Sequence, residues 1–294
     1  MDNKKLNVLL ITGIVTNEHD PRVTPMIRFA LESTKRFNVK VTEEFKGATA
    51  ETLEGYDLVF INFDGKPSIA EPYIGMGATS EKVIYDFVKG GGGAVIYHSS
   101  FIHGDPAYPD EFDHLVGAHF EMSEMKGRKS PRNDGYVDIV KGAHKITEGF
   151  PDRFCIQMDD LFFNPEWLPD VPVTVLATMY DSFEDYLDLN KMQPHMRVFY
   201  EGVTKDKLPG VDTDQPVCWI HEYGKGRVFT VSLGHGPDTL RSIPFVAMLL
   251  RGTEWAASGE VTIPYPDLEN ERRTQAWPYF LDMTVQEYAR FTSF

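Results

Sequence analysis

The sequence predicts an α/β fold in which helices cover both faces of a mainly parallel β-sheet. The first half of the 294-residue chain alternates short β-branched runs with amphipathic helical patterns, which is typical of parallel βαβ units. From about residue 130 the apolar runs become shorter, and a glycine-containing hairpin loop separates two of them, which is typical of antiparallel strands. We therefore expect a three-layer sandwich whose parallel sheet is extended by antiparallel strands.

Apolar runs and helix signals alternate regularly in the first half. Four runs predict parallel strands, at residues 6–12, 39–45, 56–62 and 94–97. Thr24 and Pro25 predict an N-cap and the first position of one helix, and Thr79 or Ser80 predicts the N-cap of another. The glycines at 90–93 end this second helix. This order of elements is typical of flavodoxin-like folds.

The second half supplies the added strands. We expect them at residues 136–140, 173–179, 217–223 and 227–233. A final core helix follows at 243–257, so the α/β domain extends over residues 1–263. Residues 264–294 are rich in aromatic side chains, which bury large areas. We expect this extension to pack on the domain or on a partner subunit, and the protein to form a homo-oligomer.

Composition excludes several classes of partner. The chain carries 44 acidic and 29 basic residues, a formal charge of −15, which disfavours nucleic acid and anionic membrane surfaces. A neutral small-molecule carbohydrate is compatible with this charge. No apolar stretch is long enough to cross a membrane, the chain enters its first strand without a signal sequence, and the two cysteines have no CxxC spacing. We therefore expect a cytoplasmic protein.

Polar residues follow several of the expected strands, where loops gather at the carboxyl edge of a parallel sheet. They are His19 and Asp20, His98 with Ser99 and Ser100, Asp159 with Asp160, and His235. Imidazoles and carboxylates suit acid/base catalysis. The same groups suit a divalent metal such as zinc, with His19, His98 and His235 as candidate ligands. In the alternative interpretation, the histidines only cap loops through backbone hydrogen bonds.

The turn after the central strand invites comparison with class I glutamine amidotransferases, in which a cysteine nucleophile occupies that turn. Here the turn carries His98, and neither Cys155 nor Cys218 lies near it, so the thiolate is missing. The bulky Tyr97 predicts that the turn is not a tight elbow, which disfavours a serine nucleophile. Nucleotide binding is also disfavoured, because no GxGxxG follows the first strand.

The order of these segments resembles the ThuA-like proteins, which are linked to trehalose utilisation, over residues 7–260. The segments that carry the resemblance are HD at 19–20, TP at 24–25, GGGAVIYHS at 91–99, FDHLVGAHF at 112–120, HKITEGFP at 144–151, DDLF at 159–162, YGKGRVF at 223–229 and LGHG at 233–236. One departure is Asp160, where relatives usually have glutamate. The resemblance implies a glutamine-amidotransferase-like fold without its cysteine.

The resemblance further implies a role in processing sugars, alongside oxidoreductases that make 3-keto sugars. We then expect isomerisation, elimination or hydrolysis of a keto sugar or glycoside, with His98 and His235 as the acid/base pair and Asp159 orienting them or sharing the proton transfer. The residues expected to contact substrate are His19, Asp20, Ser99, Asp160 and His119. The alternative is a non-catalytic sugar-binding or regulatory module, and a third class is a structural partner assembled through the aromatic extension.

Overall fold

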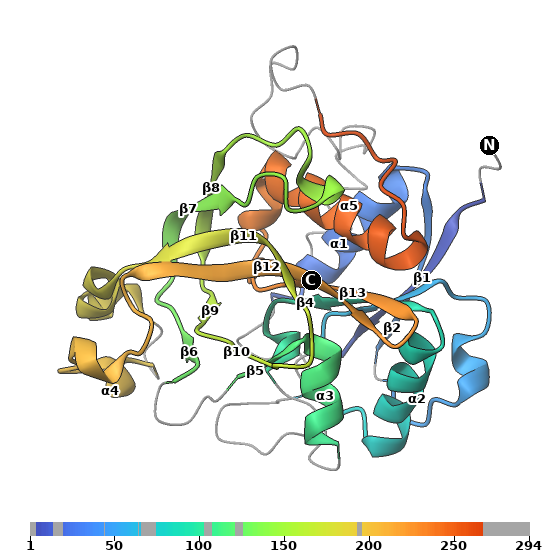
Figure 1. The fold of residues 1–294 in the computed structure, drawn as a ribbon, viewed down its shortest axis with the longest axis horizontal. Helices are drawn as coiled ribbons and strands as arrows, with labels where there is room; N and C mark the ends of the chain where they lie inside the picture. Colours follow the sequence, from blue (N-terminus) through green and yellow to red (C-terminus); the bar gives the residue numbers. More distant parts are fainter. Residues whose placement is uncertain are drawn as a thin grey trace.

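The computed structural model describes residues 4–13, 20–43, 45–63, 65, 75–102, 108–120, 126–192 and 196–266. Within these residues, nine strands form one sheet in the order β2-β1-β3-β4-β13-β12-β11-β7-β8 (Figure 1). The first five strands in this order are parallel to one another. They are β2 (Phe37–Glu43), β1 (Leu6–Thr12), β3 (Leu58–Ile61), β4 (Gly93–Tyr97) and β13 (Gly226–Val231).

The parallel half has the strand order 2-1-3-4-5 of flavodoxin-like folds, with β13 as its fifth strand. Its strands are apolar on both faces because both faces are covered: Val8 and Leu10 of β1 contribute to one core cluster, and Leu9 and Ile11 contribute to the other. The predicted α/β class is confirmed. The expected bounds of the first strand are also confirmed, since a fully buried strand is marked by its continuous apolar run.

The other four strands are antiparallel to their neighbours. They are β12 (Thr213–Tyr223), β11 (Thr174–Asp181), β7 (Asn133–Ile139) and β8 (Arg153–Asp159). Strands β12 and β13 form the expected hairpin, and Gly224 at its turn has a φ of 63°, which glycine adopts without strain. Two small two-stranded sheets pair β10 (Glu166–Trp167) with β5 (Ala118–His119), and β6 (Arg128–Lys129) with β9 (Phe162–Phe163).

Helices cover both faces of the parallel half and complete the three layers (Figure 1). Helices α1 (Val23–Ser33) and α5 (Ile243–Ser258) pack on one face. Helices α2 (Ala78–Lys89) and α3 (Pro109–Val116) pack on the other. The short helix α4 (Arg197–Tyr200) belongs to a separate lobe, described below. No helix among the described residues is long and apolar enough to span a membrane.

Two predicted helix starts are wrong. Helix α1 begins at Val23, so Thr24 lies inside its first turn, where its Oγ1 accepts a hydrogen bond from Asn62 Nδ2 at 2.9 Å. This tertiary bond replaces the expected capping role. Helix α2 begins at Ala78 with Gly77 as N-cap, two or three residues before the expected N-cap at Thr79 or Ser80. The side chain of Ser80 is instead buried within the helix.

A lobe between β11 and β12, whose described residues lie within 183–208 without 193–195, has its own small core made by Tyr186, Met192, Tyr200, Val203 and Leu208. It is anchored by Arg128 of β6, whose side chain is only 1% exposed. The Arg128 guanidinium bonds to Tyr186 Oη at 3.2 Å, to the Pro209 carbonyl at 2.6 Å and to the Asp181 carboxylate. The lobe is therefore held to the strands that carry the site described below.

The aromatic extension lies mostly outside the described residues, which end at 266. Tyr265, near its start, packs on Phe150 with ring centroids 4.4 Å apart. The packing of residues 267–294 and the oligomeric state therefore stay predictions.

Buried His221 on β12 predicts a loss of stability in acid. Its Nε2–H faces the His114 carbonyl at 3.1 Å, and burial lowers the pKa of His221 to about 4. Because the unfolded chain binds this proton near pH 6.5, stability is present above that pH and is lost as pH falls. From about pH 7.5 to about pH 5 we expect this histidine to contribute a loss of about 2 kcal/mol in the free energy of unfolding.

Denaturant unfolding at the two pH values checks this expectation. The matched variant is His221→Gln, whose amide N–H can replace the Nε2–H donor without titrating. Between the two pH values, we expect the free energy of unfolding of the variant to fall by about 2 kcal/mol less than that of the wild type. Equal pH dependence in both proteins would contradict the account.

Candidate functional site

His98 occupies a sharp turn at the end of the central strand β4. Its φ is 48°, a left-handed conformation that non-glycine residues rarely adopt, and a short 3-10 helix (His98–Phe101) follows at once. The prediction that Tyr97 prevents a tight elbow is wrong. Tyr97 is buried in the core and donates from its hydroxyl to the Gly234 carbonyl at 2.9 Å, so its ring leaves the turn free.

The loop after β13 brings His235 to the same edge of the sheet. Gly234 has a φ of 112°, and a Cβ there would lie 1.9 Å from the Tyr97 hydroxyl, so only glycine fits. The rings of His98 and His235 meet edge to face with centroids 5.2 Å apart. Two loops that are far apart in the sequence therefore present their imidazoles to each other.

Asp159 holds the His235 loop in place. Its Oδ2 accepts hydrogen bonds from Gly234 N and Thr239 Oγ1, each at 2.8 Å. Its Oδ1 accepts from His235 N at 2.9 Å and from Asp160 N at 3.1 Å. Both oxygens of this buried carboxylate are thus engaged with the protein itself. Burial raises the pKa of Asp159, and the Asp160 charge adds to this, although His98 and the backbone donors oppose it.

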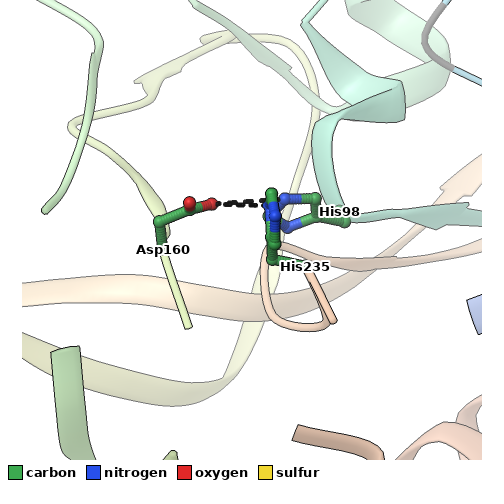
Figure 2. Close-up of side chains that lie close together, drawn as sticks. All are labelled: His98, Asp160 and His235. Atoms are coloured by element: carbon green, nitrogen blue, oxygen red, sulfur yellow. Dashed lines mark ion pairs between the residues drawn. The ribbon is translucent and has the colours of Figure 1, made fainter. Parts of the chain in front are cut away.

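Asp160 lies at the centre of the site, facing both imidazoles (Figure 2). Its Oδ1 lies 3.1 Å from His235 Nδ1 and 3.5 Å from His98 Nε2. The three side chains are buried, and their three facing atoms lie within 4.8 Å of one another. Two imidazole nitrogens and one carboxylate oxygen are also ligand types for a divalent transition metal. Asp160, predicted as a substrate contact, is therefore part of the reactive cluster itself.

Two basic residues that were not predicted as site residues flank Asp160. Arg132 Nε lies 3.0 Å and Lys129 Nζ 3.4 Å from Asp160 Oδ2. The Arg132 guanidinium also contacts His235 Nε2. A signal was present in the sequence, because residues 126–132 carry four basic side chains in an otherwise acidic chain.

The charges of the cluster shift the pKa values of its members. Burial alone would raise the pKa of Asp160, but Lys129 and the two imidazoles hold it well below its usual range. Burial would lower the pKa of His98, yet the neighbouring Asp160 carboxylate raises it overall. Asp160 is therefore ionised at neutral pH and favours a cation beside it.

The remaining predicted residues lie in different places. Asp20 donates its backbone N–H to the His235 carbonyl at 3.3 Å, and its carboxylate pairs with Arg22. Ser99 is fully buried beside His98. His119 lies on β5, where its Nδ1 is 2.8 Å from Asp113 Oδ2. His19 lies outside the described residues. The structure thus brings together His98, Asp159, Asp160 and His235, with the backbone of Asp20 next to them.

A comparison with protein families matches residues 7–256 to the ThuA model, which is described as trehalose utilisation. The match covers most of the chain. The protein belongs to the ThuA family. A comparison with curated proteins finds no match.

Solved structures share the fold of this ThuA family member. A ThuA-like protein from Parabacteroides merdae superposes with a TM-score of 0.66 at 21% identity, over 90% of this chain and 94% of that one. A ThuA-like protein from Bacteroides uniformis gives a TM-score of 0.57 at 16% identity, over 87% and 93% of the two chains. A cytoplasmic protein from Salmonella typhimurium gives 0.54 at 12% identity, over 85% and 99%. These similarities concern the fold.

Proposed function

We propose that this protein processes a keto sugar or its glycoside by proton transfer at the cluster around Asp160. The observation that carries the proposal is the convergence of His98, Asp160 and His235 at the carboxyl edge of the sheet, the edge at which open α/β folds bind ligands. Membership of the ThuA family, described as trehalose utilisation, supports a carbohydrate as the substrate.

The chemistry follows from the ketone. A carbonyl acidifies the neighbouring C–H, so a base can remove that proton while the electron pair moves onto the carbonyl oxygen. His235 and His98 are the candidates for the base and the acid, and Asp159 is a positioning residue because both of its oxygens hold backbone or side-chain donors. The product of this step carries a negative charge on oxygen.

The basic residues around Asp160 suit this developing charge. Lys129 and Arg132 line a pocket beside Asp160 together with Met192, Met196 and Tyr200. Preorganised cationic donors in a partly desolvated pocket stabilise an oxyanion better than water does. The lobe at residues 183–208 supplies the apolar side of this pocket through Met192, Met196 and Tyr200.

Single substitutions of the two histidines test the proposal. We expect His98→Ala and His235→Ala to lower the turnover of a 3-keto glycoside by at least about 100-fold, because general acid/base groups contribute on that order. The measurement is the rate of sugar conversion followed by NMR. A wild-type protein that saturates with the sugar but leaves it chemically unchanged would instead be a binding module, and the proposal would then be wrong.

A further inference from the structure

The ligand atoms of the cluster are spaced like the corners of a coordination polyhedron. Zinc bonds to histidine nitrogen and carboxylate oxygen at about 2.0–2.2 Å, so neighbouring ligand atoms lie about 3.0–3.5 Å apart. The separations of Asp160 Oδ1 from His235 Nδ1 and His98 Nε2 are 3.1 and 3.5 Å. Asp160 Oδ1 and His235 Nδ1 are both buried and lie within ion-pair distance of each other, yet neither forms a well-aligned hydrogen bond with a described residue. Such a buried arrangement can accommodate an ion between the two atoms.

The surrounding contacts orient two of these ligand atoms. His98 Nδ1 lies 2.8 Å from the Ser232 carbonyl, which can only accept, so the ring carries its proton on Nδ1 and turns Nε2 to the cluster. Asp160 Oδ2 is held by Arg132 and Lys129, which leaves Oδ1 facing the imidazoles. Metal-binding histidines and carboxylates in proteins are commonly fixed by second hydrogen bonds of this kind.

We propose that His98, Asp160 and His235 bind one divalent transition-metal ion, with Zn²⁺ as the best match to the ligand set. Three protein ligands leave coordination positions open, as in catalytic rather than structural zinc sites. Two nitrogens and one carboxylate oxygen favour Zn²⁺, Fe²⁺ or Mn²⁺ over Ca²⁺, which prefers oxygen ligands alone.

Arg132 has to move when the ion binds. Coordination through His235 Nδ1 places the ring proton on Nε2, where the donor-only guanidinium of Arg132 now makes contact. The Arg132 side chain is about one-third exposed, at 32%, so it can turn toward solvent or toward an anionic substrate oxygen.

This inference rests on the proposed function for the role of the ion. With both imidazoles as ligands, the ion would polarise the carbonyl of a keto sugar in place of His98, and a water at one of its open positions would accept the proton in place of His235. The protein need not turn over any sugar for binding itself to be measured.

The test titrates the metal-stripped full chain with Zn²⁺ by calorimetry and with Co²⁺ by its visible absorption. We expect one ion per chain, and we expect Asp160→Asn and His235→Gln each to weaken binding by at least about 10-fold. The matched control is His144→Gln, which removes a half-buried histidine that caps the 3-10 helix Lys145–Thr147 and packs on Trp255 of α5, and it should bind like the wild type.

Thermal unfolding shows whether each variant is folded and whether Zn²⁺ stabilises it. Zn²⁺ should raise the melting temperature of the wild type and of His144→Gln, but not that of a His98→Gln/His235→Gln double variant. Wild-type binding no tighter than that of the double variant overturns the metal site. If sugar turnover persists in that case, the proton-transfer proposal stands; if an ion binds tightly and no keto sugar reacts, the proposed function fails while the metal site stands.

Discussion

Replacing Asp159 with asparagine is expected to lower sugar turnover by at least about 100-fold and the free energy of unfolding by about 3 kcal/mol. All four groups that bond to this carboxylate are donors in the structure. In the asparagine variant the amide NH₂ replaces one of the two oxygens. At either position it would face a backbone N–H, so two donors would meet and no hydrogen bond could form. The loop that carries His235 would then shift, and a displacement of about 1 Å at a reacting group costs roughly 100-fold in rate.

Denaturant unfolding and the turnover assay measure the two effects of Asp159→Asn. Thr239→Val is the matched control, because it removes only the bond from Thr239 Oγ1 to Asp159 Oδ2 and keeps the shape of the side chain. We expect this control to lose about 1 kcal/mol and to keep most of its turnover. Equal turnover in Asp159→Asn and the wild type would mean that Asp159 does not position the site.

Replacing Arg128 with methionine is expected to lower the free energy of unfolding by about 3–5 kcal/mol. Arg128 and Asp181 are both buried and paired, so the variant leaves the Asp181 carboxylate without its partner charge. The lobe at residues 183–208 also loses the bonds from Arg128 to Tyr186 and Pro209. Because Lys129 follows directly in β6, we expect sugar turnover to fall as well.

A double variant separates the buried charge from the packing. Arg128→Met combined with Asp181→Asn removes both charges, so it should be more stable than the sum of the two single losses predicts. Denaturant unfolding of the four proteins gives this coupling energy. Strictly additive losses would contradict a buried ion pair between these two residues.

Much of the fold could be predicted from local patterns. A buried strand such as residues 6–12 is a continuous apolar run, and the alternation of such runs with helical patterns indicates parallel units. Helix starts were less predictable, because Thr24 uses its hydroxyl for a tertiary bond to Asn62 instead of a cap. Strand β8 was not among the expected strands, because its apolar run at residues 154–156 is short and lies at the open edge of the sheet.

The site was predictable only in outline. The sequence indicates that Asp159 and Asp160 follow an apolar run, but neighbouring residues in an extended chain face opposite ways, and nothing local says which one faces the histidines. The structure turns Asp160 to His98 and Asp159 to the backbone of the His235 loop. Lys129 and Arg132 contact Asp160 because the fold places β6 beside the cluster. The sequence shows the basic segment, but no local pattern indicates that it lies next to Asp160.

The central claim is that one cluster, formed by His98, Asp160 and His235, moves a proton on a keto sugar. Its most direct test is to incubate the wild-type protein with a 3-keto glycoside in deuterated water and to follow the carbon next to the ketone by NMR. We predict that deuterium enters at that carbon and that exchange is lost in His98→Ala. Binding of the sugar without exchange, or exchange at the same rate in His98→Ala, would contradict the account.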